Sequence, residues 1–153
     1  MKRGLFFLLF LLFFAEQAQA ITLGGCAQSA KINGKCPVTF NYIQIGPYTD
    51  KDASLDYKSI NLGPVLAKET KIRWSIKISK NFSYNYNVLY ACQATPDIAE
   101  ATGNVLTKSI ATETVFKIPY NPKNCYCKIW VIVKDSKTNA ILGSANSRPF
   151  QIC

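Results

Sequence analysis

Positions 71–78 alternate strictly between polar and apolar residues. The apolar positions are Ile72, Trp74, Ile76 and Ile78, and the polar ones are Lys71, Arg73, Ser75 and Lys77. Successive side chains of a β-strand point to opposite faces, so this period of two predicts a strand with one buried face. Trp74 lies on the apolar side and is expected in the core.

A second alternation covers positions 125–134, where both sides are largely apolar. One side carries Cys125, Cys127, Ile129, Val131 and Val133, and the other carries Tyr126, Lys128, Trp130, Ile132 and Lys134. A strand that is apolar on both faces is typical of the middle of a sheet. This pattern leaves open whether Trp130 is a core residue or a surface residue.

Further strands are predicted between clusters of turn-forming residues. They are Val38–Ile45, Tyr86–Cys92, Thr114–Ile118 and Ile141–Ile152, the last one broken near Asn146 and Ser147. A short helical turn is expected at 96–101, since Asp97 and Glu100 would lie in its first turn and Gly103 could end it. Short strands with almost no helix predict an all-β fold, an antiparallel β-sandwich of the immunoglobulin or fibronectin III-like type.

The first twenty residues have the pattern of a cleaved secretory signal. Lys2 and Arg3 precede an apolar run at 5–15, and Ala18-Gln19-Ala20 offers a small-x-small cleavage site. The run is too short to span a bilayer, which takes about 20 apolar residues. We therefore expect a secreted protein, extracellular or associated with a cell wall, whose residues 21–153 form one domain.

All six cysteines follow that signal, and an oxidising compartment would pair them. They are Cys26, Cys36, Cys92, Cys125, Cys127 and Cys153. If the strands near 86–92, 125–133 and 145–153 are antiparallel neighbours, the last four cysteines meet at one edge. Cys92 and Cys153 would then each bond one of Cys125 and Cys127, and Cys26 would bond Cys36. A zinc or redox site is the alternative, but the Cys-Tyr-Cys spacing does not fit either motif.

The chain contains no histidine, which excludes Ser-His-Asp and Cys-His catalysis and removes the usual ligand of zinc, copper and haem. Its carboxylates lie in predicted loops among polar residues. We therefore expect no enzymatic activity, no metal and no cofactor. The formal net charge is +9, and it becomes +8 without Lys2, Arg3 and Glu16. Because the lysines are spread along the chain, we expect a solvated surface, with attraction to an anionic wall polymer or membrane as the alternative.

The spread of the lysines predicts no nucleic-acid partner, and the lack of a second hydrophobic segment predicts no membrane anchor. Asn81-Phe82-Ser83 is an acceptor sequon, so Asn81 is the expected glycosylation site. A sugar ring stacks on exposed flat side chains, which makes a set of aromatic residues candidates for ligand binding. They are Tyr84, Tyr86, Tyr120, Tyr126 and Trp130. Their alternative role is that of half-buried strand residues.

The order of segments in the latter part of the chain is also informative. It runs through Lys71–Ile76, Tyr86–Cys92, Val115–Pro119, Tyr126–Asp135 and Ser144–Ile152. Over residues 70–152 this order resembles the immunoglobulin-like domain of fungal Ser/Thr-rich cell-wall surface proteins and of the Kre/Knh proteins of β-1,6-glucan assembly. The chain differs in lacking a Ser/Thr-rich stalk and a lipid-anchor tail, and in carrying Cys125 and Cys127. The resemblance implies a non-catalytic extracellular module and brings no active residues with it.

The leading hypothesis is a secreted module that binds a cell-wall polysaccharide or a surface glycoprotein. One alternative is a small lipid carrier of the MD-2-related type, which needs two sheets splayed around an apolar cavity. A secreted effector that binds a host protein is the other. The sequence leaves the ligand and the oligomeric state open.

Overall fold

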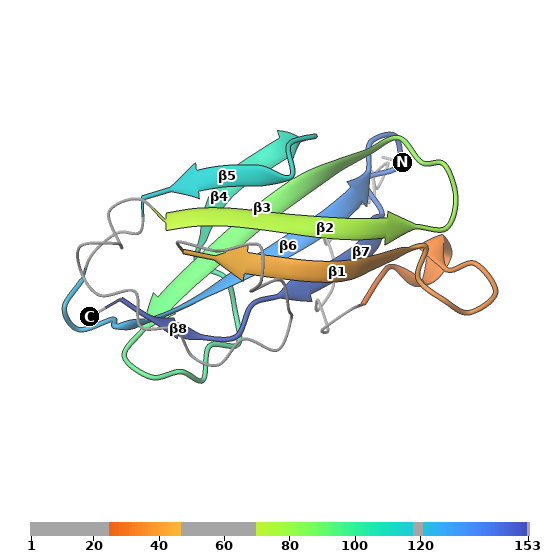
Figure 1. Cartoon of the computed structure of the whole chain (residues 1–153). Coiled ribbons are helices and arrows are strands. Elements are labelled where there is room, and N and C mark those ends of the chain that lie inside the picture. The colour runs from red at the N-terminus through yellow and green to blue at the C-terminus, as the bar shows by residue number, and fades with distance from the viewer. Residues whose placement is uncertain (1–24, 47–69, 118–120, 153) are drawn as a thin grey trace, which may run out of the picture.

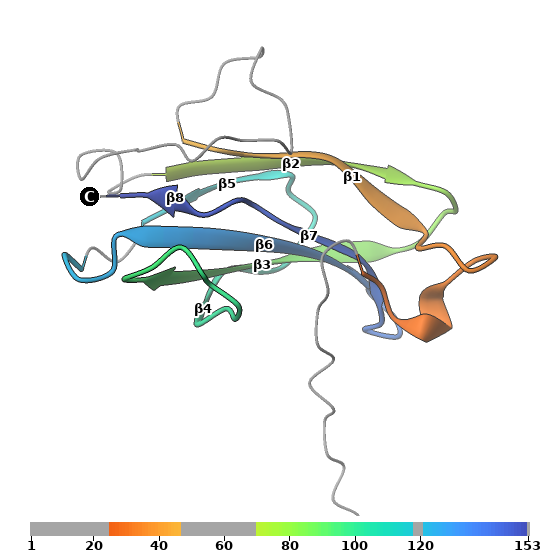
Figure 2. The same cartoon turned by 90° about the horizontal axis from the view of Figure 1, so that it is seen from below.

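Two antiparallel sheets packed face to face make up the computed structural model, which describes residues 25–46, 70–117 and 121–152 (Figures 1 and 2). The three-stranded sheet has the order β1 (Val38–Ile45), β2 (Thr70–Ile78) and β5 (Glu113–Phe116). The five-stranded sheet has the order β4 (Gly103–Ser109), β3 (Tyr84–Gln93), β6 (Tyr126–Asp135) and β7 (Ile141–Asn146), and β8 (Phe150–Gln151) also pairs with β6. One short 3₁₀ turn, η1 (Gln28–Ala30), precedes β1. The predicted all-β antiparallel sandwich is confirmed.

The strands with regular alternation fall where the sequence predicts them. β1 has the expected bounds, and β6 lies between β3 and the β7–β8 edge, as its two apolar faces indicate. The last predicted strand is broken after Asn146, as expected: β7 ends there, and Phe150 resumes pairing with β6 opposite Cys127. The predicted signal at 1–20, Tyr120 and Cys153 lie outside the described residues.

The sequence interpretation fails in the segment after β3. The expected helical turn at 96–101 is wrong, because this segment is irregular chain with bends, and the N–H of Ile98 donates to the carbonyl of Pro96. Ile98 is buried, with 3% exposed, against Ala91 and Trp130 on the outer face of the five-stranded sheet. β4 was not predicted, since its apolar residues Val105 and Leu106 are adjacent rather than alternating, and its register with β3 is interrupted.

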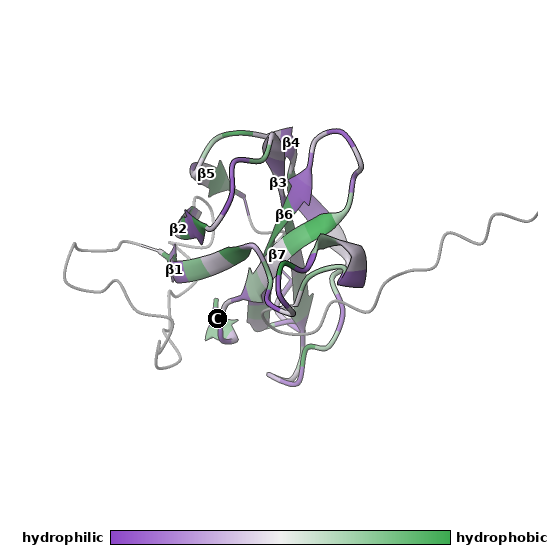
Figure 3. Cartoon of the chain, turned by 90° about the vertical axis from the view of Figure 1, so that its right-hand side faces the viewer, coloured by the Kyte–Doolittle hydropathy of each residue, from purple (hydrophilic) through white to green (hydrophobic). Residues whose placement is uncertain are grey.

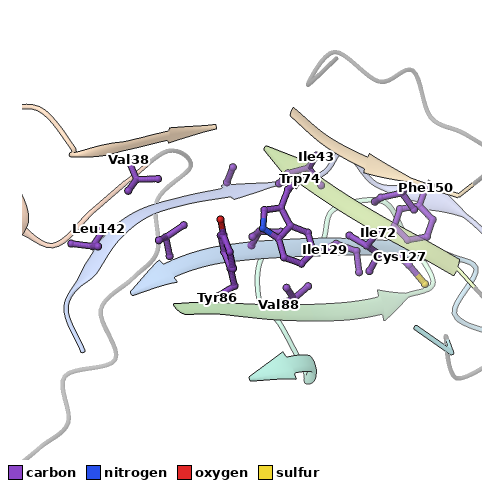
Figure 4. Packing of buried hydrophobic residues seen from close by; sticks show 14 of the residues in the cluster. Val38, Ile43, Ile72, Trp74, Tyr86, Val88, Cys127, Ile129, Leu142 and Phe150 are labelled. Atoms are coloured by element: carbon purple, nitrogen blue, oxygen red, sulfur yellow. The ribbon is translucent and has the colours of Figure 1, made fainter. Parts of the chain in front are cut away.

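The core lies between the two sheets (Figure 4). Trp74 of β2 is 2% exposed, as predicted, and its ring meets that of Tyr86 of β3 edge-on, with 5.2 Å between the centroids. Val88, Ile129 and Val131 are fully buried around them. Fully burying such an aliphatic side chain contributes about 1.5–3 kcal/mol. An end-on view shows the two layers and the hydropathy of their strands (Figure 3).

Disulfides fasten both ends of this framework. Cys26 bonds Cys36, as predicted, and Cys92 of β3 bonds Cys127 of β6, which is one of the two partners expected for it. Cys92 and Cys127 face each other in the register of the two strands. Cys125 is also disulfide-bonded.

Candidate functional site

A pocket of about 550 Å³ opens at one edge of the sandwich. It is lined by residues 38–40 of β1, by residues 144–149 at the end of β7 and in the connection to β8, and by Lys128 of β6. β1, β7 and this connection run along the same edge (Figure 1). The volume lies within the range of about 300–1,000 Å³ that is usual for small-molecule sites.

β1 and β7 meet closely at one point beside the pocket. A Cβ atom on Gly143 would lie 2.7 Å from the carbonyl oxygen of Val38 and 2.9 Å from its Cβ, so only glycine fits there without displacement. Beyond this contact β7 ends at Asn146, and Pro149, which has no N–H to donate to a ladder, precedes β8. Ser147 bridges the break: its N–H donates to the carbonyl of Ile129, and its Oγ accepts from the N–H of Ile129.

One part of the lining is apolar and another is polar. Val38, Phe40, Ala145 and Pro149 supply the apolar surface. Thr39, Asn146 and Ser147 supply hydroxyl and amide groups. The Oδ1 atom of Asn146 is buried and has no hydrogen-bond partner among the described residues. A buried acceptor without a donor is costly, so this atom lowers the stability of the pocket wall.

The charged lining residues are both cations. Lys128 donates from Nζ to the carbonyl of Ile98 at 3.1 Å, and Nζ lies 5.3 Å from the ring centroid of Trp130. Burial lowers the pKa of Lys128, since the ammonium is partly removed from water. Arg148 lies in the connection between β7 and β8, and it is exposed. The described lining contains no carboxylate.

The four described aromatic residues among those predicted to bind a ligand do not form an exposed strip. Tyr86 is 1% exposed, because its place in the alternation of β3 directs it into the core, and it is therefore not available to a ligand at the surface. Tyr84 is half-buried with its ring edge-on to Tyr86. Trp130 is 7% exposed and packs with Ala91 and Ile98 on the outer face.

Two other predicted site residues have clear places. Tyr126 packs partly buried beside Trp130, and its hydroxyl accepts a hydrogen bond of 2.8 Å from Gln151. Asn81 is exposed between β2 and β3, and its glycosylation stays a prediction.

The sequence interpretation did not assign the pocket residues. Phe40 and Asn146 belong to strands that were predicted, and the break near Asn146 and Ser147 was expected. The break was the one signal for a pocket in the sequence, because an interrupted edge strand leaves room beside the neighbouring strand. The sequence did not show that β1 of the other sheet faces this break.

No protein-family model and no curated protein matches the chain. The resemblance to fungal cell-wall domains therefore stays a prediction. The described residues contain no group of three or more His, Cys, Asp and Glu side chains that could hold a metal ion. Within the same ranges, no helix is long and apolar enough to cross a membrane. Two disulfides in a small β domain fit an extracellular protein.

Proposed function

We propose that this chain is a secreted, non-catalytic β-sandwich module that binds a carbohydrate of a cell-wall polysaccharide or surface glycoprotein in the edge pocket. The supporting observation is the pocket of about 550 Å³ in which an apolar surface stands beside polar side chains. A sugar has an apolar C–H face and several hydroxyls, so its recognition needs both kinds of surface. Phe40 and Pro149 can contact the ring, while Thr39 and Asn146 can bond hydroxyls.

The framework around the pocket supports a binding role. Val38 and Gly143 fix the distance between β1 and β7, and the Cys92–Cys127 bond ties β6 to β3. A site held on such strands loses little conformational freedom when a ligand binds, which favours affinity. Since the sequence contains no histidine, and the described lining contains no carboxylate, general acid-base chemistry in the pocket would lack its usual groups.

A pull-down with insoluble β-glucan, chitin and whole cell walls at low salt tests the proposal. We expect retention of the native protein on at least one of them, and loss of retention with Phe40→Ala and Asn146→Ala. Asn104→Ala, on an exposed position of β4, is the matched control and should be retained. If the native protein is retained on none of these polymers, the proposal is wrong.

A small amphiphile is a second candidate ligand, favoured by the apolar lining from Val38, Phe40 and Ala145. The centre of the sandwich is filled by Trp74 and Tyr86, so a lipid would occupy the edge pocket rather than the space between the sheet centres. Native mass spectrometry of the purified protein distinguishes the lipid carrier from the carbohydrate-binding module. A copurified lipid mass that is lost in Phe40→Ala would favour the carrier function.

A further inference from the structure

We propose that this chain associates with a second copy of itself through the outer edge of β5, so that the two three-stranded sheets join into one continuous sheet. β5 is the last strand of its sheet, and within the described ranges it pairs only with β2. Figure 1 shows β5 at the edge of the molecule, with β2 between it and β1. The inference goes beyond the proposed function and does not depend on what the edge pocket binds.

The hydrogen bonds of β2 show which backbone groups of β5 point outward. The N–H of Trp74 donates to the carbonyl of Thr112 at 3.0 Å. Bond direction alternates along an antiparallel strand, so Glu113 and Val115 direct their backbone N–H and C=O groups away from β2. Lys71, which lies opposite Val115, agrees with this, because its carbonyl accepts a bond from the residue that follows β1. β5 therefore offers donors and acceptors to another strand.

The edge of β5 is also apolar and regular. Val115 is 56% exposed and Ile110, in the connection from β4, is 82% exposed, which makes two of the three large apolar side chains that are exposed in the described part of the chain. The carbonyl of Val115 accepts a long bond of 3.5 Å from the Oγ1 of Thr114 and keeps a second lone pair. Register shifts interrupt the pairing of the edge strands β1, β4 and β7, but not that of β5. Since bulges protect sheet edges against further pairing, β5 lacks this protection.

The sequence of β5 and of the residue after it fits a second copy. In antiparallel pairing centred on Val115, the two Val115 residues lie opposite each other, and Glu113 lies opposite Lys117 of the other copy. Opposite charges across two strands stabilise a sheet and like charges destabilise it, so registers centred on Glu113 or on Lys117 are unfavourable. The favoured register sets the outward backbone groups of both copies against each other. It also repeats under a two-fold axis, as a symmetric dimer requires.

The dimer leaves the edge pocket open. β1, which lines the pocket, and β5 are opposite edges of the three-stranded sheet. Each dimer therefore presents two pockets, and two linked sites hold a repeating polymer more tightly than one.

Sedimentation velocity of the native protein between about 1 µM and 1 mM tests the inference, because a short strand makes a small interface and a weak dimer. We expect the average mass to rise towards twice the monomer mass as the concentration rises. Val115→Lys sets two cations opposite each other and should weaken self-association about tenfold or more. Asn41→Lys makes the same charge change at an exposed position of β1 and should leave self-association unchanged.

Charge reversal tests the register. Glu113→Lys alone and Lys117→Glu alone each set like charges opposite each other and should be monomeric. Their equimolar mixture should form dimers again, since each cation then lies opposite an acid. Unfolding curves establish that each variant is folded, and if a charge-reversed variant does not fold, Val115→Lys decides the question on its own.

Three results would overturn the inference. They are a native protein that stays monomeric up to about 1 mM, a Val115→Lys variant that dimerises as the native protein does, and a mixture of the folded charge-reversed variants that stays monomeric. Each of these results leaves the proposed carbohydrate function standing, because none of the substituted residues lines the edge pocket.

Discussion

The centre of the sandwich and its β1–β7 edge are built from the same alternating strands but differ in how completely they are filled. At the centre, Trp74 and Tyr86 interlock between the sheets and almost no side-chain surface reaches solvent. At the edge, Gly143 lets β1 approach closely, and the strand break beyond it leaves an open pocket. The centre therefore contributes most of the buried packing, whereas the edge holds an open pocket.

Trp74→Ala is the most damaging single change expected from this comparison. Removing a buried aromatic side chain leaves a cavity and costs about 3–5 kcal/mol of unfolding free energy. Chemical denaturation measures it. Phe40→Ala, in the partly buried lining of the pocket, should cost clearly less. Equal losses at the two positions would contradict the distinction between centre and edge.

Replacing Cys92 and Cys127 together by alanine should cost about 2–4 kcal/mol. The bridge closes a separation of 35 residues, against 10 for Cys26 and Cys36. In the loop-entropy account the first pair therefore contributes about 1 kcal/mol more than the second. Chemical denaturation of the two double variants tests which disulfide contributes more to the free energy of unfolding. A larger loss on removing the Cys26–Cys36 bond would show that it stabilises by another route.

Gly143→Ala should destabilise the protein by about 1–3 kcal/mol, because the new methyl group would meet the backbone of Val38. The sign of the change in unfolding free energy is informative. A strand glycine replaced by alanine without steric conflict usually stabilises, by about 0.4–1 kcal/mol, since the unfolded chain loses freedom. A rise in the melting temperature of Gly143→Ala would contradict the close approach of β1 and β7.

The smallest expected effect concerns Asp135 in the β6–β7 turn. Hydrogen bonds from the N–H groups of Thr138 and Lys137 hold the pKa of this carboxyl below its ordinary value of 3.8. The ionised form is therefore favoured in the folded state, so its contribution is present above that value and is lost as the pH falls through the lower folded pKa. Unfolding between about pH 5 and pH 2 should show a shallower acid loss for Asp135→Asn. An unchanged slope would show that the turn does not depend on the charge.

The regular strands could be predicted from sequence because alternation is a local property. β1 and the central place of β6 follow from it, and so does the burial of Trp74. β4 could not be predicted, since its apolar residues do not alternate. The burial of Ile98 could not be predicted either, because it depends on Ala91 and Trp130 of two other strands.

The site was harder to predict than the fold. Aromatic residue type suggested Tyr86 and Trp130 as ligand contacts, whereas packing buries both. The pocket depends on Val38 and Gly143 meeting across the two sheets, which is a non-local contact. The strand break at Asn146 was visible in the sequence, but what it faces was not.

Chemical-shift mapping of the ¹⁵N-labelled protein during titration with soluble β-glucan and chitin oligosaccharides tests the central claim most directly, because it reports on centre and edge in one experiment. The account predicts that amide signals of residues 38–40 and 144–148 shift in proportion to saturation, while those of Trp74, Tyr86 and Val131 stay in place. Saturable shifts centred elsewhere on the surface, with residues 38–40 and 144–148 unaffected, would contradict it.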